Sequence, residues 1–305
     1  MQGKEYILSD DRLTLVKWLN QEVKSVAMQD DELLSKVRTI GQKAFQGLTN
    51  LECVQLPNHL ETIEEWGFGE CIGITEIDLP ESLKRIGTAA FRGSSLTSIV
   101  IPDSVTDLGE NVFEATQITK AVLPKDMKIL PHATFAHTSL TTIDLPEGLT
   151  EISSWAFAHS KIESVTLPES ITTIADTAFA YTFLGEITLH NGITTIGDNA
   201  FEDTLITEVL IPLKLSVIGN KTFAGTKLKS VFIPSNVELI KRSAFLNCKD
   251  LRLVIVENKR PPILQSTCFN PKYQADFKIV VPRGCAQAYK SAKGWEKYAA
   301  YIVDK

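Results

Sequence analysis

Two histidines, His137 and His159, stand 22 residues apart, and Asp203 occupies the same position two such intervals further on. If each interval forms one coil, stacking would bring the two imidazoles about 5 Å apart. Imidazole and carboxylate groups are common zinc ligands, so His137, His159 and Asp203 form a candidate metal site. The alternative is that a repeat copied a loop residue, because the sequence shows no outer residues that would orient such ligands. We favour the alternative and expect no metal or cofactor.

No other residue pattern points to catalysis. The chain has no G-x-S-x-G, H-E-x-x-H or Walker sequence, so no nucleophile elbow, metalloprotease helix or phosphate loop is expected. Its five cysteines show no spacing typical of a disulfide framework or a metal site. We therefore expect a protein that is not an enzyme.

Composition excludes further classes of function. The net charge of −6 gives no basic surface of the kind that binds nucleic acid. No apolar run is long enough to predict a transmembrane segment. The first residues lack a charged and then apolar signal segment. Either the protein stays in the cytoplasm, or a signal segment has been removed.

The elements that would position any site are set by a phenylalanine that returns every 22 or 23 residues. A fixed period in this range, with regularly spaced leucine and isoleucine, is typical of a leucine-rich-repeat solenoid. A single coil cannot bury its own apolar face, so neighbouring coils must stack. The sequence therefore predicts a β-rich leucine-rich-repeat solenoid of about ten 22–23-residue coils with a parallel strand per coil. The phenylalanine column comprises Phe45, Phe68, Phe91, Phe113, Phe135, Phe157, Phe179, Phe201, Phe223 and Phe245.

Each unit fits the template L-x-x-I-x-L-P-x-x-L-x-x-I-x-x-x-A-F-x-x-T. The I-x-L segment alternates apolar and polar residues, which predicts a half-buried strand, and the proline that follows ends it. His190 replaces this proline in one coil. The second apolar pair, such as Leu149 and Ile152, would line the opposite wall. Small or hydroxyl-bearing residues after the phenylalanine should satisfy backbone groups in the turns. They are Cys71, Thr116, Thr138, Ser160, Thr182, Thr204, Thr226 and Cys248.

The two ends depart from the template. We expect an N-terminal cap over residues 1–22, repeats over 23–256, and an irregular last coil with a C-terminal cap over 257–305, because the open ends of a solenoid need capping. Residues 277–282 should form a last strand. A short helical segment over 287–298 would be anchored by Tyr289, Trp295 and Tyr298.

The template resembles the BspA-like leucine-rich repeats, also called the Treponema pallidum type. The ending from Ile279 to Trp295 is similar to the C-terminal cap of such proteins in Bacteroides-like bacteria, and the segment from Leu15 to Gly41 resembles their entry coil. The resemblance covers roughly residues 10–305. It implies a secreted or surface-anchored bacterial protein, at the cell surface or outside the cell, that binds host or bacterial partners. It implies no catalytic residues.

The outward side of the I-x-L segments, here called the strand face, is the expected partner site. It is mostly small and polar, with two apolar stretches, Val100 with Val122 and Leu210 with Phe232 and Ile255. Large exposed apolar patches usually mark interfaces. The alternative is that the C-terminal cap folds over Leu253, Ile255 and Phe232. The candidate partner-binding residues are Val100, Val122, Asp144, Thr166, Thr188, Glu186, Glu208, Leu210 and Phe232.

Two binding functions remain open. The first is adhesion to a host or bacterial surface protein through the strand face. The second is a carbohydrate-binding surface module that uses Asp144, Thr166, Thr188 and Trp155. A repeated scaffold defines how a surface is built and not which molecule fits it, so the sequence does not name the partner.

Overall fold

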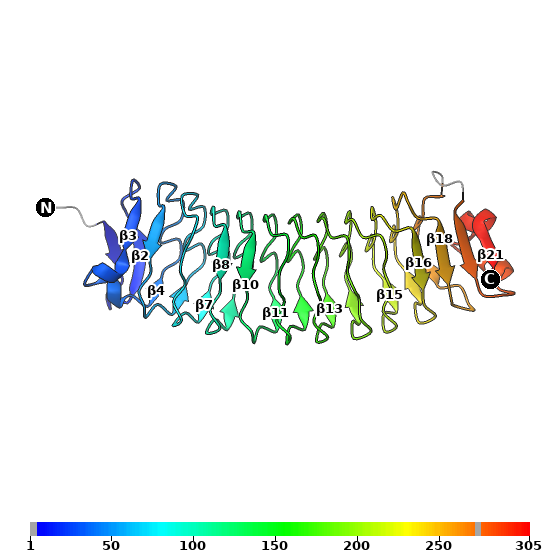
Figure 1. The fold of residues 1–305 in the computed structure, drawn as a ribbon, viewed down its shortest axis with the longest axis horizontal. Helices are drawn as coiled ribbons and strands as arrows, with labels where there is room; N and C mark the ends of the chain where they lie inside the picture. The colour runs from blue at the N-terminus through cyan, green and yellow to red at the C-terminus, as the bar shows by residue number, and fades with distance from the viewer. Residues whose placement is uncertain (1–4, 272–275) are drawn as a thin grey trace. The chain divides into compact units, whose positions relative to one another are not determined.

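The computed structural model describes residues 5–271 and 276–305. The chain forms two compact units. The first unit contains Met1–Leu149 and Ala156–Ile162, and the second contains Thr150–Trp155 and Glu163–Lys305. In both units successive coils of the chain stack through parallel strands, which confirms the predicted leucine-rich-repeat solenoid (Figure 1).

The second apolar pair of each coil forms a short parallel strand, and these strands make up the wall here called the second wall. In the first unit β2 (Thr14–Trp18), β4 (Thr39–Ile40), β6 (Thr62–Ile63), β7 (Arg85–Ile86) and β9 (Asp107–Leu108) pair in this order. The same unit contains β11 (Ile129–Leu130). In the second unit β12 (Glu151–Ile152), β13 (Thr173–Ile174) and β14 (Thr195–Ile196) pair, as do β15 (Val217–Ile218), β17 (Leu239–Ile240) and β19 (Ile263–Leu264).

Pairing on the strand face is less regular than the template predicts. In the first unit β3 (Ser25–Ala27) pairs with β5 (Cys53–Gln55), and β8 (Ser98–Val100) pairs with β10 (Lys120–Val122). In the second unit β16 (Ser230–Ile233), β18 (Leu253–Val256), β20 (Lys278–Val281) and β21 (Ile302–Asp304) form one parallel sheet. The I-x-L segments at 77–79, 143–145, 165–167 and 187–189 form no strand. There the expectation of a strand before each proline is wrong, and the parallel strand of those coils lies on the second wall.

The phenylalanine column is the core of both units. All ten rings are at most 1% exposed. Neighbouring rings stack with centroids 4.8–6.0 Å apart from Phe45 to Phe157 in the first unit. From Phe179 to Phe269 in the second unit the spacing is 5.5–5.7 Å. Each coil thus buries one large ring against the next, which a single coil could not do alone.

The hydroxyls that follow the phenylalanines bind backbone, as expected. The threonine hydroxyl donates to the carbonyl of the phenylalanine three residues earlier, for example from Thr138 to Phe135 at 2.8 Å. Thr116, Thr182, Thr204 and Thr226 make the same bond. Ser160 differs, because its buried hydroxyl has no hydrogen-bond partner.

The proline column begins a turn in every coil. The carbonyl of each proline accepts the backbone N–H of the residue three positions later, as in Leu149 to Pro146 at 3.0 Å. His190 does the same through Ile193 at 3.1 Å. The turn therefore does not require proline, although the fixed φ of proline suits it.

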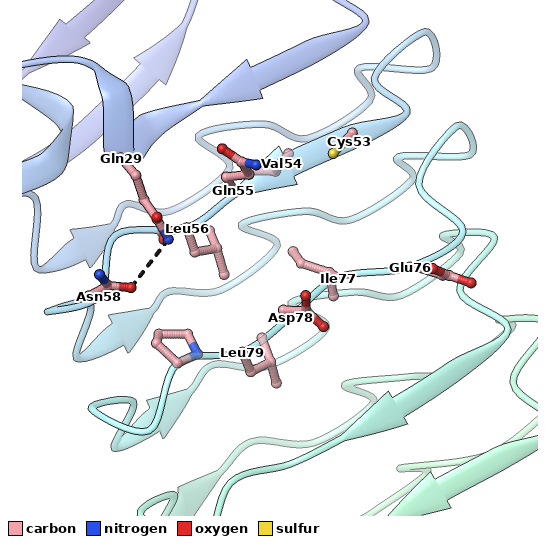
Figure 2. A pocket seen from close by; sticks show the side chains of 11 residues that line it. Gln29, Cys53, Val54, Gln55, Leu56, Asn58, Glu76, Ile77, Asp78 and Leu79 are labelled. Atoms are coloured by element: carbon pink, nitrogen blue, oxygen red, sulfur yellow. Dashed lines mark hydrogen bonds between the residues drawn. The ribbon is translucent and has the colours of Figure 1, made fainter.

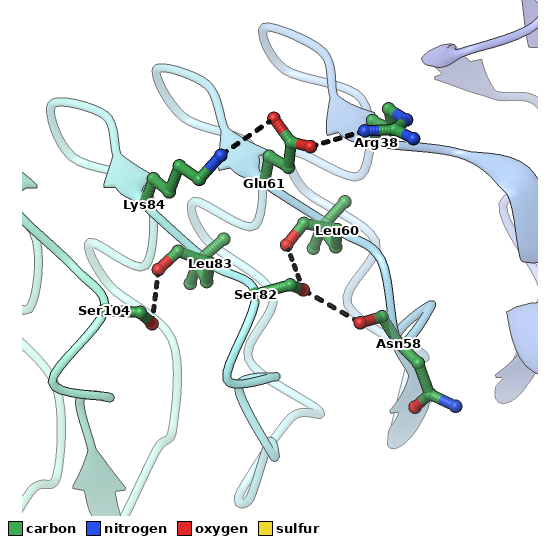
Figure 3. A network of polar contacts seen from close by, with 8 residues as sticks. All are labelled: Arg38, Asn58, Leu60, Glu61, Ser82, Leu83, Lys84 and Ser104. Carbon is green, nitrogen blue, oxygen red and sulfur yellow. Dashed lines mark hydrogen bonds and ion pairs between the residues drawn. The ribbon is translucent and has the colours of Figure 1, made fainter.

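Charged and hydroxyl side chains link neighbouring coils along the edges (Figure 3). Glu61 lies between Arg38 and Lys84 of the two adjacent coils. Lys84 and the hydrogen bond from Arg38 lower the pKa of this carboxyl. Ser82 donates to the carbonyl of Leu60 at 2.7 Å. Such exposed ion pairs add little stability individually.

Both ends carry elements outside the repeat. Near the start, β1 (Tyr6–Leu8) runs antiparallel to β2, and two single-turn 3₁₀ helices, Met28–Asp30 and Leu34–Lys36, follow β3. At the other end lie α1 (Ala286–Ser291), the 3₁₀ helix Glu296–Tyr301 and then β21. Tyr289, Trp295 and Tyr298 are all buried, as their predicted anchoring role requires. The proposed boundaries at residues 22 and 256 stay a prediction.

Candidate functional site: the strand face

The candidate residues on the strand face all reach solvent. Successive side chains of an extended segment point to opposite sides, so the residue that follows a buried inward residue faces outward. In four such segments the buried inward residues are Ile99, Ala121, Val209 and Val231. The exposed residues include every candidate: Val100, Val122, Asp144, Thr166, Thr188, Glu186, Glu208, Leu210 and Phe232. They belong to different units, so they are described here in two groups.

In the first unit the apolar part of this face is a valine pair. Val100 and Val122 lie opposite each other in the parallel strands β8 and β10. They are 62% and 45% exposed, and Ser98 and Lys120 flank them in the same register. Asp144 is exposed on the next coil. This group offers only a small apolar area.

In the second unit a longer apolar row crosses the strand face. Leu210 pairs with Phe232 through an isolated bridge, Phe232 pairs with Ile255, Ile255 with Val280, and Val280 with Val303. These five residues, here called the apolar stripe, occupy one register position on five successive segments. Leu210 is 75% exposed, Phe232 38% and Val303 42%.

The C-terminal cap does not cover this stripe. The alternative was that the cap folds over Leu253, Ile255 and Phe232, and it does not hold for Phe232, which remains 38% exposed. Leu253 and Ile255 are half-buried. The cap instead extends the sheet with β20, which pairs with β18, and β21, which pairs with β20. Their alternating residues continue the pattern of β18, so Ile279 and Ile302 are buried on the inner side. The cap thereby lengthens the exposed apolar row.

Val280 and Val303 are the members that sequence reasoning missed. The alternation in Lys278–Val281 already placed Val280 in the same phase as Ile255, so the signal was present. The strand at Ile302–Asp304 has no repeat pattern, and nothing in the sequence predicted its register.

A cavity of 480 Å³ lies beside the stripe. One side of the cavity is lined by Glu208, Leu210 and Phe232, and the other side is lined by Ile187 and Thr188. It opens where the segments at 187–189 and 208–210 form no strand, apart from the isolated bridge between Leu210 and Phe232. A groove between coils therefore accompanies the apolar surface.

A second cavity, of 400 Å³, lies on the strand face of the first unit and is here called the polar slot (Figure 2). The polar slot opens beside β5. Within the described residues, the backbone groups of Ile77 and Asp78 make no hydrogen bond to another coil. Gln29 extends over it and donates to the Leu56 carbonyl at 2.8 Å and to Asn58 Oδ1 at 3.2 Å. The polar slot is also lined by Gln55, Glu76 and Asp78.

The two histidines come together as the repeat predicts. The rings of His137 and His159 stack with centroids 4.6 Å apart and planes 5° from parallel. Burial, and then the neighbouring His137, lower the pKa of His159. Asp203 belongs to the second unit. Across residues 5–271 and 276–305, no group of three His, Cys, Asp or Glu side chains could hold a metal ion. Two stacked imidazoles therefore support the metal hypothesis, but the described residues supply no third ligand beside them.

The exposed tryptophan considered for glycan binding lies in a turn. Trp155 is 39% exposed and has a positive φ of 63°. Trp66 holds the equivalent position, also at positive φ, with the Arg92 guanidinium 5.5 Å from its ring centre. The two rings lie in different units.

The fold defines a repeat protein with an open, solvent-exposed strand face, and comparison with known proteins identifies the class. The family described as BspA type leucine rich repeat region matches residues 23–139 and 128–252 in six copies. Most of the chain is covered, so the chain belongs to this family, and the resemblance seen in the sequence is confirmed. Proteins built on such solenoids are typically binding proteins that present an extended surface.

Solved structures show the same fold. A leucine-rich repeat protein from Bacteroides ovatus is 21% identical, with 96% of this chain and 87% of that chain covered and a TM-score of 0.72. The pneumococcal vaccine antigen PcpA is 15% identical over 95% of this chain and 90% of its own, with a TM-score of 0.56. A leucine rich cell surface protein from Faecalibacterium prausnitzii is 18% identical over 91% and 97%, with a TM-score of 0.51.

No sequence among the curated proteins matches the chain. Within the described ranges, no helix has the length and the apolar character needed to cross a bilayer.

Proposed function

We propose that this protein is a non-catalytic binding module of the bacterial surface, which engages a protein partner through its strand face. The observation that carries the proposal is the apolar stripe from Leu210 to Val303. Five apolar side chains in one register position, three of them well exposed, form a larger apolar row than a solvated sheet face needs.

The surroundings of the stripe suit a protein interface. Glu208 and Lys278 are exposed beside it and would form a polar rim around an apolar centre. Phe232 lies on the edge strand β16, between Leu210 and Ile255, and is the aromatic member of the apolar stripe. Aromatic residues are enriched among those that contribute most of the binding free energy of an interface. The adjoining groove would accept a side chain of the partner.

The surface location is supported by relatives. One structurally similar protein is described as a cell surface protein and another as a vaccine antigen, and both share the fold over most of their length. A protein displayed in this way would meet host or bacterial surface proteins.

The test is a binding screen of the purified chain against host matrix proteins, mucins and bacterial surface proteins, followed by Phe232→Glu. A buried, unpaired carboxylate at the centre of an interface should weaken binding by at least about tenfold, which is about 1.4 kcal/mol. Thermal unfolding should change little, because Phe232 is already partly in water.

Two matched controls make the result specific. Ser164→Glu adds the same charge to an exposed strand-face position of the second unit outside the apolar stripe, and Val100→Glu tests the valine pair of the first unit. Both should leave affinity within about twofold, or about 0.4 kcal/mol. Unchanged affinity in Phe232→Glu would show that the stripe is not the site, and loss in Val100→Glu alone would move the site to β8 and β10.

A carbohydrate-binding surface module is the second candidate, and the polar slot favours it. Its amides and carboxylates, from Gln29, Gln55, Asn58 and Asp78, are the donors and acceptors that sugar hydroxyls need. The set of Asp144, Thr166, Thr188 and Trp155 stays a prediction. Binding to a glycan array that is lost in Asp78→Ala and retained in Phe232→Glu would support this function over the first.

A further inference from the structure

His190 occupies the place that proline holds in the neighbouring coils, and it precedes the only Asn-Gly pair of the chain, Asn191-Gly192. All three residues lie in the second unit, directly after the segment that lines the groove beside the apolar stripe. The hydrogen bonds of the His190 ring have no counterpart in the coils that hold proline at this position.

The imidazole of His190 contacts the backbone nitrogen of Gly192. That N–H donates to His190 Nδ1 at 3.1 Å. The other ring nitrogen, Nε2, lies 3.1 Å from the carbonyl of Pro168, which can only accept. Nε2 therefore carries the proton and Nδ1 the free electron pair, so the ring is oriented as a base toward the Gly192 nitrogen.

Only glycine fits this contact. A Cβ built on Gly192 would lie 2.8 Å from two atoms of the imidazole. Glycine also leaves its own nitrogen open to approach, because it has no side chain to shield it.

The side-chain amide of Asn191 is polarised from the other direction. Its Oδ1 accepts the backbone N–H of Leu213, in the next coil, at 3.0 Å. A backbone N–H aimed at a carbonyl oxygen stabilises the negative charge that develops there when a nucleophile adds to the carbon. The turn thus places a base, a nucleophilic nitrogen and an oxyanion donor around one amide.

We propose that Asn191 is a site of self-catalysed deamidation, with His190 as the general base and the Leu213 N–H as the oxyanion donor. His190 Nδ1 takes the proton of the Gly192 nitrogen, which forms a bond to Asn191 Cγ. The Cγ–Nδ2 bond then breaks and ammonia leaves with the proton from the imidazolium, giving a cyclic imide. Water opens the imide at either carbonyl, so the product is aspartate or isoaspartate.

Glu169 supports the charged intermediate. Its carboxylate lies 3.6 Å from His190 Nδ1, where it can pair with the imidazolium that exists between the two proton transfers. The product adds a negative charge, and in the isoaspartate form an extra main-chain methylene, at the rim of the strand face. The proposal is independent of the proposed binding function.

The test is peptide mapping of the purified full chain during incubation at neutral pH, with aspartate and isoaspartate at position 191 measured by mass and by chromatography. Each sample is run folded and in denaturant, so that the denatured chain supplies the rate set by local sequence alone. The folded protein should convert Asn191 severalfold faster than the denatured chain, whereas ordinary packing would slow it.

His190→Pro is the matched variant, because proline begins the same turn in the other coils and should preserve the fold. A positioned general base contributes roughly 10²–10⁴-fold, so the folded-to-denatured rate ratio should fall at least about tenfold. His190→Gln, which keeps a polar side chain, should lower the ratio similarly and provides the measurement if the proline variant does not fold. A folded rate at or below the denatured rate, or a ratio unchanged in both variants, would overturn the proposal.

Discussion

The hydroxyl of Tyr298 binds both backbone polar groups of Phe269, accepting its N–H at 3.1 Å and lying 3.2 Å from its carbonyl. It also accepts the N–H of Cys268 at 3.0 Å. Phe269 is the last ring stacked on the phenylalanine column of the second unit. Its coil is not followed by another repeat whose backbone could bind the N–H and C=O groups of Phe269. One side chain of the cap thus replaces the backbone of a missing coil.

Tyr298→Phe should therefore destabilise the second unit. The variant keeps the ring and leaves two buried N–H groups without their acceptor, each worth about 1–3 kcal/mol. We expect a loss of about 2 kcal/mol or more in the free energy of unfolding, measured by denaturant titration. Tyr301→Phe is the control, since that ring is half-buried; an equal effect in both would show that the hydroxyl of Tyr298 is not the cause.

Phe135→Ala should be among the most destabilising single changes in the first unit. The ring is fully buried and stacks on Phe113 and Phe157 at 5.6 and 6.0 Å. Loss of transfer free energy and the cavity left behind should cost about 3–5 kcal/mol. Thermal and denaturant unfolding provide the measurement, and Val122→Ala, on the exposed strand face, is expected to cost far less.

Thr138→Val and Ser160→Ala form a matched pair in the turn column. Thr138→Val keeps the shape and removes the donor to the Phe135 carbonyl, so it should cost about 1 kcal/mol or somewhat more. Ser160 has a buried hydroxyl with no partner, so Ser160→Ala should be neutral or stabilising. Equal costs in the two variants, from denaturant titration, would contradict a role for the hydrogen bond.

The stacked histidines predict a pH effect on the first unit. Burial, and then the neighbouring His137, lower the pKa of His159 below its ordinary value of 6.5. The unfolded chain therefore binds more protons between the two pKa values, and stability should fall as the pH drops through 6.5 and level off below the folded value.

His159→Asn should remove this part of the pH dependence. Asparagine tolerates the positive φ of 57° at this position, as Asn247 does in the equivalent turn. On lowering the pH from about 7.5 to about 5, the melting temperature of the wild type should fall more than that of the variant. A difference between the two melting temperatures that stays constant over this range would show that the pKa of His159 does not change on unfolding.

The class of fold was predictable because stacking imposes a period that the sequence must carry. Each of the ten phenylalanines and the threonines that follow them repeats the same local contact, so one unit predicts the others. The strand at 278–281 was predictable for the same reason, since its alternation matches that of β18.

Pairing on the strand face was not predictable from the template. The segment at 77–80 reads Ile-Asp-Leu-Pro and the segment at 99–102 reads Ile-Val-Ile-Pro, so both have two alternating apolar residues before a proline. Only the second contributes to a strand, β8, which ends at Val100. Whether two coils approach closely enough to exchange backbone hydrogen bonds depends on how every layer beneath them packs, and the interruptions produce the polar slot and the groove beside Phe232.

By itself the sequence determined the coil, its core ring, its turns and the side of each strand-face residue, because these depend on contacts that recur at a fixed spacing. Only the tertiary structure decided that the cap extends the apolar row through Val280 and Val303, and that His190, Gly192 and Leu213 meet around Asn191. The alternation in Lys278–Val281 indicated the side on which Val280 lies, but the pairing of β20 with β21 and the contact between Leu213 and Asn191 join different segments, whose register is set by packing.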